Sequence, residues 1–396
     1  MINTECQLGS VRRGGAPLLL LVLLCVLLSG CMSANGNIIG VGADVAFENE
    51  NAHRIFIATT RARSDDPEEF YSGERSRGLA LGYVDVNIPP NHQIGQIEKP
   101  SSGDADPAKH FVVSSPEIAE SDQSFRNSIN AALAGKTGQD KSVLVFVHGY
   151  NVNFSSAVLR IAQFVNDTGY QGVPVLFSWA SRGRTLDYVY DLNSALQARN
   201  QLEKLGLILS RTNAQHFDVV AHSMGNLVTI EAMRDLRNRS GGRQDRRLRR
   251  VILASPDIDI DVFRTQLQGF EGTENLFFVL ISDDDKALRL SRRIAGGVSR
   301  VGAADPQTLA ELGVNVIDLS QIEDKGSANH SKFADSPEIV QLIGKGINQG
   351  NTLSAREEKG ALQTIAGGVL KSVTIIPTTL LTGTESVIVT LGSGVD

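Results

Sequence analysis

The stretch FDVVAHSMGNLVTIEAMRDL, residues 217–236, places a serine between an apolar, β-rich run and a run with helical spacing. Ser223 has Ala221 two positions before it and Gly225 two positions after it. In a sharp strand-to-helix turn these two positions must be small, because the two backbones nearly touch there and the serine hydroxyl projects from the fold. The stretch therefore predicts a nucleophile elbow.

The context of the serine matters, because a small-x-Ser-x-small string is expected on the order of once by chance in a chain this long. The residues FDVVAH are typical of a short buried strand. After the serine, Leu227, Ile230, Met233 and Leu236 recur at helical spacing. A serine that only caps a helix remains the alternative until a base and an acid are found.

Composition sets the class of protein. The 396 residues are 41% hydrophobic and 21% charged, which suits a globular chain with one substantial α/β core and appendages. The formal net charge of -6 gives no support to nucleic-acid binding. A basic run, RNRSGGRQDRRLRR at 237–250, is interrupted by glycines. We expect a solvated loop there, with a patch for anionic lipid or a surface polymer as the alternative.

The N-terminus has the features of an export signal. Arg12 and Arg13 precede APLLLLVLLCVLLSGC, an apolar run too short for a comfortable membrane span. Its end, LSGC at 28–31, resembles the lipobox of bacterial lipoproteins, in which the cysteine is lipidated after cleavage before it. The resemblance implies a signal peptide at 1–30, a lipid on Cys31 and a tether at 31–50. The alternative is a cysteine that ends an uncleaved anchor.

Cysteine usage agrees with this interpretation. Cys6, Cys25 and Cys31 are the only cysteines. The body after Cys31 therefore has no disulfide, no cysteine metal site and no cysteine nucleophile. Met32 and Ser33 include no aspartate, which by the lipoprotein resemblance implies a lipid-anchored protein of the outer membrane that faces the periplasm.

The rest of the chain divides into three parts. Residues 51–140 contain β-rich runs and are expected to form a small N-terminal extension. Residues 141–346 alternate strand, loop and helix, which predicts one domain with a mostly parallel sheet flanked by helices. Its catalytic residues should lie at the carboxyl ends of the strands. Residues 347–396 show no clear periodicity and are expected to form a flexible or surface-packed tail.

Several motifs occur in one order along the chain. VFVHGYN at 145–151 resembles the loop after an early strand of α/β-hydrolases, and AHSMGN at 221–226 resembles their elbow. A bacterial branch of largely uncharacterised hydrolases is similar in four further stretches: ATxR at 58–61, VxIP at 86–89, FSWxSRG at 177–183 and ASPDID at 254–259. The chain thus resembles an α/β-hydrolase over about 53–346, and departs from G-x-S-x-G only in having Ala221 as the first small residue.

A serine nucleophile needs a base and an acid that orients the base. In α/β-hydrolases the acid and then the base follow the serine. His330, in the polar loop GSANHSKFADSP, is the only histidine after Ser223. Its position beyond the last clear strand, and the similarity of HSxFADSP to the branch, favour the base over an ordinary solvated histidine.

The acid has two candidate positions. Asp257 lies in ASPDIDID, whereas Asp283, Asp284 and Asp285 follow the next predicted strand in LISDDDKALRLS. Resemblance to the branch motif SxxDxAL favours Asp285. We expect Asp283 or Asp284 to cap the following helix, whose first turn favours negative charge, while Asp285 faces the base.

The oxyanion of acyl transfer needs backbone N–H groups, which contribute on the order of 3 kcal/mol each. The superfamily pattern implies Met224, directly after the nucleophile, and Tyr150, after His148 and Gly149. His148 and His222 are expected to support loop geometry without transferring protons.

Other chemistries lack their motifs. Neither a G-x-x-x-x-G-K-[ST] loop nor a strand-following G-x-G-x-x-G is present, so no nucleotide cofactor is expected. No H-E-x-x-H or clustered Asp/His spacing predicts a metal. The sequence predicts a serine hydrolase, carboxylesterase- or lipase-like, acting on a small ester or lipid at the envelope. The alternative is a catalytically silent hydrolase scaffold that serves as an envelope binding protein.

Overall fold

The structure is a computed structural model that describes residues 40–41, 51–66, 69–101, 105–322, 328–349, 370–379 and 385–393. All of them belong to one compact unit, Asn37–Asp396. The predicted signal peptide, Cys31 and most of the predicted tether lie outside the described residues. Within the described ranges no helix has the length and apolarity needed to cross a membrane.

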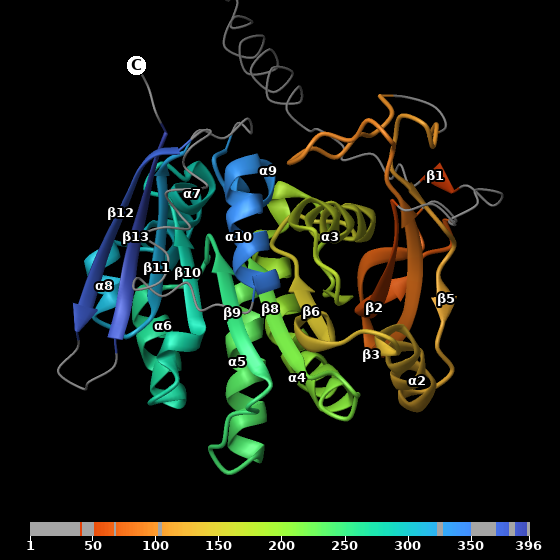
Figure 1. Cartoon of the computed structure of the whole chain (residues 1–396), viewed down its shortest axis with the longest axis horizontal. Coiled ribbons are helices and arrows are strands. Elements are labelled where there is room, and N and C mark those ends of the chain that lie inside the picture. Colours follow the sequence, from red (N-terminus) through yellow and green to blue (C-terminus); the bar gives the residue numbers. More distant parts are fainter. Residues whose placement is uncertain are drawn as a thin grey trace, which may run out of the picture. The chain divides into compact units, whose positions relative to one another are not determined.

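A mostly parallel sheet forms the centre of the unit (Figure 1). Six neighbouring strands pair in parallel. In spatial order they are β7 (Val173–Ser178), β6 (Ser142–Val147), β8 (His216–His222), β9 (Leu248–Ala254), β10 (Phe277–Ile281) and β11 (Asn315–Gln321). They confirm the predicted fold class, a mostly parallel sheet flanked by helices.

The strands are apolar throughout because both faces of the sheet are covered. All six residues of β6, SVLVFV, are buried. Their side chains alternate between two cores: Val143 and Val145 face one, and Leu144 and Phe146 face the other. A strand buried on both faces needs a continuous apolar run, and β-branched and aromatic residues pack well on a pleated surface.

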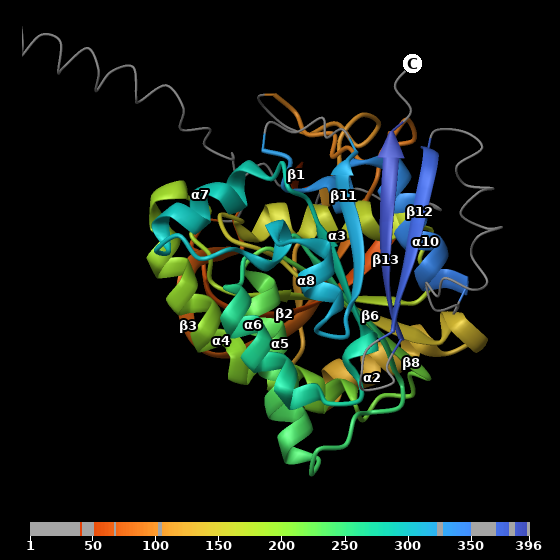
Figure 2. The same cartoon turned by 90° about the vertical axis from the view of Figure 1, so that its left-hand side faces the viewer.

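Helices flank both faces (Figure 2). One core includes residues of α3 (Phe154–Thr168), α9 (Lys332–Asp335) and α10 (Pro337–Gln349). The other core includes residues of α2 (Asp122–Leu133), α4 (Tyr188–Leu209), α5 (Gly225–Arg239), α6 (Ile260–Leu267) and α8 (Pro306–Ala310). A ninth described helix, α7 (Lys286–Ile294), begins just after the carboxyl end of β10.

The predicted N-terminal extension contributes strands to the same sheet. β2 (Ala52–Arg63) pairs in parallel with β7, and β3 (Tyr71–Asn87) pairs antiparallel with β2. Three two-residue strands extend this edge: β1 (Gly40–Val41) pairs with β4 (Val112–Val113), and both β4 and β5 (Glu117–Ile118) pair with β3. The extension and the six parallel strands therefore share one hydrogen-bonded sheet.

The C-terminal part also joins the sheet. β13 (Glu385–Ser393) pairs in parallel with β11, and β12 (Leu370–Thr379) pairs antiparallel with β13. These two strands were not predicted from the sequence. β12 and β13 cover the edge of β11, and an uncovered edge strand would expose unpaired backbone groups.

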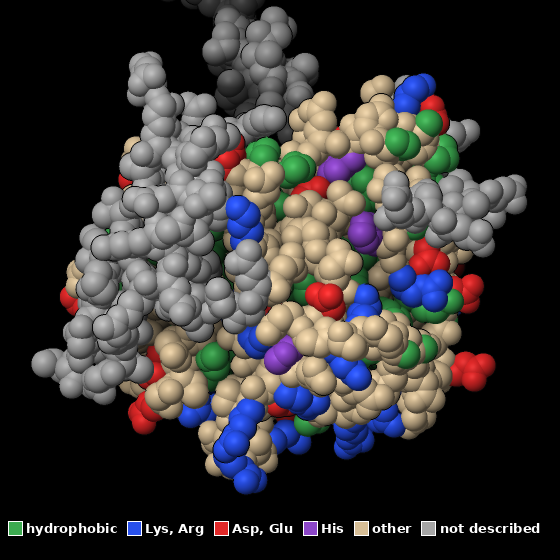
Figure 3. Space-filling model, in the orientation of Figure 1, with side chains coloured by type: hydrophobic (Ala, Val, Ile, Leu, Met, Phe, Trp, Pro, Cys, Tyr) green, Lys and Arg blue, Asp and Glu red, His purple; other side chains and the backbone are tan. Residues whose placement is uncertain are grey.

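The basic run at 237–250 forms the end of α5, a loop and the start of β9. In Figure 3, which has the orientation of Figure 1, Lys and Arg side chains gather along the lower edge of the molecule, around the lower end of α5. Arg239 pairs with Glu203, Arg247 with Asp245 and Arg249 with Asp218. At least part of this positive charge is thus already paired with neighbouring carboxylates.

Candidate active site

Ser223 occupies the turn between β8 and α5 that the sequence predicts. Its φ is 53°, in the left-handed region that costs a non-glycine residue free energy, and its residue surface is 3% exposed. Hydrogen bonds hold this conformation: the Ser223 N–H donates to Ala254 O at 3.0 Å, and the Asp257 N–H donates to Ser223 O at 3.2 Å. A Cβ on Gly225 would lie 2.3 Å from His148 O, so the position after the turn requires glycine.

The loop after β6 packs directly on this turn. A Cβ on Gly149 would lie 2.6 Å from the Cβ of Ser223. Tyr150 follows Gly149, and Met224 follows Ser223. Among the described residues, neither the Tyr150 N–H nor the Met224 N–H donates a hydrogen bond to the protein. Two unsatisfied backbone donors therefore lie next to Ser223, as an oxyanion hole requires.

The structure brings His330 and Asp285 together. His330 Nδ1 lies 2.6 Å from Asp285 Oδ2, and Asp285 is fully buried. An ionised carboxylate only accepts hydrogen bonds, so His330 Nδ1 carries the proton and Nε2 is left as the acceptor. The ring of His222, the residue before Ser223, lies 4.8 Å from the His330 ring between centroids. His222 Nε2 also donates to His330 O at 3.0 Å, so His330 is held beside the elbow.

Asp285 also makes the helix-capping contact that was expected of Asp283 or Asp284. Its Oδ1 accepts the Leu288 N–H at 2.9 Å and caps the N-terminus of α7. The expectation that Asp283 or Asp284 caps this helix is wrong. One carboxylate uses one oxygen for the cap and the other for the histidine, which fixes its orientation.

Asp284 instead holds the loop that carries His330. Its Oδ1 accepts from the buried Lys332 Nζ at 2.8 Å, and its Oδ2 accepts from Asn329 Nδ2 at 2.6 Å. Burial raises the pKa of Asp284, but the hydrogen bonds from Lys332 and Ser282 lower it by more than burial raises it. The pKa of Asp284 is therefore below its ordinary value. These contacts flank His330 on both sides, and sequence reasoning did not find them.

Asp257, the other candidate acid, belongs to a different cluster. It accepts hydrogen bonds from Tyr188 Oη at 3.0 Å and Ser291 Oγ at 2.5 Å, and it pairs with Arg300 at 3.2 Å. No hydrogen bond or ion pair joins Asp257 to His330 in the part of the chain that the structure describes.

His148 and His222 are unsuited to proton transfer at neutral pH. Burial and then the charge of Arg61 lower the pKa of His148 to about 3. Burial, followed by the charge of His330, lowers the pKa of His222 well below its ordinary value. His148 Nδ1 lies 2.9 Å from Gly149 O, and its ring stacks on Trp179 with centroids 5.0 Å apart. Its contacts are those of a residue that supports a loop.

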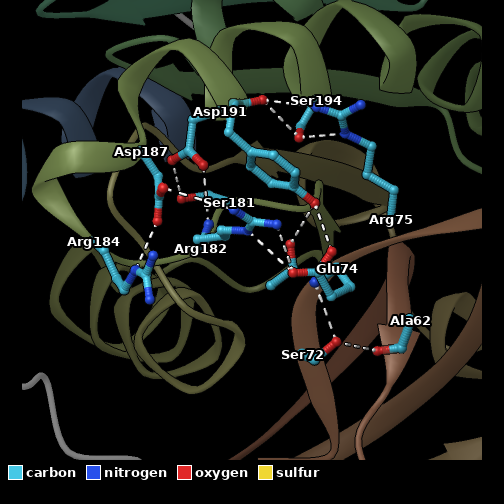
Figure 4. Close-up of polar contacts among 12 residues, drawn as sticks. Ala62, Ser72, Glu74, Arg75, Ser181, Arg182, Arg184, Asp187, Asp191 and Ser194 are labelled. Atoms are coloured by element: carbon cyan, nitrogen blue, oxygen red, sulfur yellow. Dashed lines mark hydrogen bonds and ion pairs between the residues drawn. The ribbon is translucent and has the colours of Figure 1, made fainter.

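The segment between β7 and α4 lies beside the loop of Tyr150. The rings of Tyr150 and Tyr188 meet edge to face at 5.2 Å, and Tyr150 Oη donates to Thr185 O. Figure 4 shows how polar contacts tie this segment to β3, with Arg182 bonded to Glu74. Leu186 is 92% exposed there.

The described residues contain no group of three or more His, Cys, Asp or Glu that is placed to bind a metal ion.

A family model for α/β-hydrolases of unknown function, DUF900, matches residues 121–346, which span the elbow, Asp285 and His330. The chain belongs to this family. A comparison with curated proteins gives no match.

Solved structures of other hydrolases are similar to this α/β-hydrolase. Aspergillus fumigatus lipase B is 13% identical over 71% of this chain and 66% of its own, with a TM-score of 0.38. A Pyrobaculum calidifontis esterase is 12% identical over 54% of this chain and 78% of its own, with a TM-score of 0.32. A Pseudomonas putida esterase is 12% identical over 78% and 84%, with a TM-score of 0.32. With TM-scores below 0.5, the fold rests on the sheet topology and the family match.

Proposed function

We propose that the protein is a serine hydrolase that cleaves carboxylic esters through an acyl-enzyme. Ser223 is the nucleophile, His330 the general base and then acid, and Asp285 the residue that orients the histidine. The N–H groups of Tyr150 and Met224 bind the oxyanion. The observation that carries the proposal is the His330–Asp285 contact of 2.6 Å beside a serine in the left-handed conformation.

The chemistry follows from these positions. Ser223 Oγ attacks the carbonyl carbon of the ester while His330 Nε2 takes its proton. The carbonyl oxygen becomes negative and accepts hydrogen bonds from the two free backbone N–H groups. The tetrahedral intermediate collapses when His330 gives the proton to the leaving alcohol. Water then repeats the sequence on the acyl-enzyme, which releases the acid and restores Ser223.

A fluorophosphonate probe tests the nucleophile against the alternative of a silent scaffold. We expect covalent labelling of the wild-type protein and none of Ser223→Ala. A matched control is Ser156→Ala, in α3, which should label like wild type. Absence of labelling in folded wild-type protein would favour the binding scaffold.

Apolar side chains beside the site support an ester with an apolar group. Leu186, in the segment next to Tyr150, is 92% exposed, and Val189, in the first turn of α4, is 65% exposed. Contact with an apolar acyl chain or alcohol would bury this surface, which would stabilise the bound ester by about 25 cal/mol for each Å² removed from water. A series of p-nitrophenyl esters of increasing chain length tests this. We expect kcat/KM to rise from acetate toward longer chains, and a steady fall with length would contradict it.

We also propose that a lipid on Cys31 tethers the enzyme to the outer membrane, facing the periplasm. The lipobox-like LSGC after a short apolar run supports this location. Cys31→Ala should abolish palmitate incorporation and release the protein from the membrane fraction, whereas Cys25→Ala should keep both. Unchanged labelling of Cys31→Ala would refute the tether.

A further inference from the structure

Arg61, at the end of β2, is a buried cation, 1% exposed. Its Nε donates to Ser178 Oγ at 2.8 Å, and its NH1 donates to Ser181 O at 2.6 Å and Ser72 O at 3.2 Å. Its NH2 donates to Val152 O at 2.7 Å and lies 3.3 Å from His148 Nε2. Burial lowers the pKa of Arg61 to about 10, which leaves it charged at neutral pH.

Asp191, in the first turn of α4, is the matching buried anion, fully enclosed. Its Oδ2 accepts from Ser181 Oγ at 2.5 Å and its Oδ1 from the Arg182 N–H at 3.0 Å, as Figure 4 shows. Ser181 connects the two charges, because its carbonyl accepts from Arg61 while its hydroxyl donates to Asp191.

Both charges hold the loop that follows β6. Asp191 Oδ2 accepts the Asn151 N–H at 3.2 Å, and Ser181 Oγ accepts the Val152 N–H at 3.0 Å. Arg61 holds the Val152 carbonyl. Asn151 has a φ of 59°, a left-handed conformation that these contacts stabilise.

The loop so held contains the oxyanion donor. Gly149 packs on Ser223, and the next N–H, that of Tyr150, has no acceptor among the described residues. A donor aimed in advance lowers the barrier because it needs no reorganisation during the reaction. Two buried charges cost more free energy than apolar side chains of similar volume, so packing alone is a poor reason for them.

We infer that Arg61 and Asp191 are positioning residues, which brace residues 148–152 so that the Tyr150 N–H faces the carbonyl oxygen at Ser223. This inference rests on the proposed function. The side chains act through the backbone and touch no substrate.

The test compares Arg61→Lys and Asp191→Asn with Arg54→Lys. Lysine keeps the charge of Arg61 but cannot bond three separate segments in the fixed guanidinium geometry. Arg54 lies on the same strand, β2, in an exposed pair with Asp85 at 2.8 Å, which makes it the matched control. If the buried variants do not fold, Ser181→Ala removes only the hydroxyl between Asp191 and the Val152 N–H.

Three readouts separate positioning from stability. Hydrogen exchange of the amides at 149–152 reports the order of the loop without any substrate. Steady-state kinetics, corrected for the concentration of active sites, give kcat and KM for an activated ester. The inhibition constant of an alkyl boronic acid, which forms a tetrahedral adduct on serine, reports the oxyanion site.

We expect faster exchange at 149–152, a fall in kcat of about 10- to 100-fold, and weaker boronate inhibition by a similar factor. KM and the pH profile of kcat should change little, since the His330–Asp285 contact remains. Arg54→Lys should match wild type throughout. Folded variants with wild-type exchange at 149–152 overturn the inference, whether or not the enzyme is active. A wild-type protein inert to both ester and boronate refutes the proposed function, while the exchange comparison still decides the inference.

Discussion

Replacing Asp285 with asparagine tests the proposed mechanism at its most specific contact. The carboxylate accepts two hydrogen bonds in the structure, one from His330 Nδ1 and one from the Leu288 N–H. An asparagine side chain has one acceptor oxygen and one donor group. It can therefore satisfy the helix cap or the histidine, but not both.

The two orientations of the asparagine amide have different effects on turnover and stability. If the amide oxygen keeps the cap, the NH₂ group faces His330 and favours the tautomer with the proton on Nε2, which cannot take a proton from Ser223. The equivalent change in a serine protease lowers turnover about 10⁴-fold, or about 5.5 kcal/mol in the barrier. If the amide oxygen faces His330 instead, the cap is lost, at about 1 kcal/mol of unfolding free energy.

We expect the first outcome, because the buried N-terminus of α7 needs an acceptor. The measurement is turnover of one activated ester, with the unfolding free energy from urea titration as the control for stability. A loss of turnover of about 10⁴-fold with little loss of stability supports the assignment. Near-normal turnover in a folded Asp285→Asn variant would refute it.

Three further predictions follow from the same contacts. Asp257→Asn should lose about 1–3 kcal/mol of unfolding free energy, because it weakens a buried hydrogen-bonded cluster, yet keep most of its turnover; an inactive, folded variant would move the acid to the end of β9. Gly149→Ala should lower turnover about 100-fold or more, because its Cβ would lie 2.6 Å from that of Ser223, whereas Gly78→Ala, where an added Cβ meets nothing within 4 Å, should not. Equal activity of Gly149→Ala and wild type would show that this loop does not pack on Ser223. Burial lowers the pKa of His92, but the hydrogen bonds that its ring donates to Asp167 and Glu98 raise it more. The stabilisation that charged His92 gives the fold is therefore present below about pH 6.5 and is lost as pH rises through the raised pKa. The urea concentration at the midpoint of unfolding should fall more steeply with pH between pH 6 and 9 for wild type than for His92→Gln. Parallel curves would exclude a contribution of charged His92 to stability.

Local patterns explain which features could be predicted. The strands β6 to β11 have continuous apolar runs, and the elbow and the DDD and HS motifs are short stretches with their own chemistry. The Arg61 brace has no such pattern, because Arg61 and Ser181 are 120 positions apart. The ATxR and FSWxSRG stretches were recognised only as resemblance, and the structure shows that their side chains bond to each other. The double contact of Asp285 depends on the direction of its two oxygens, which sequence spacing does not specify.

The strand order explains why the loop of His330 needs its own support. Ser223 follows β8, whereas His330 follows β11, which lies three strands away. At about 4.8 Å per strand this is about 14 Å, more than a histidine side chain spans. His330 must therefore lie across the carboxyl ends of β10 and β9 for its imidazole to approach the serine. Asp285 follows β10, which lies between β11 and β8 in the sheet, and Asp284 beside it bonds to Asn329 and Lys332 on either side of the histidine. The acidic run after β10 thus bonds to His330, the proposed base, through one carboxylate and holds its loop through the next, which is a physical reason for adjacent aspartates at this strand end.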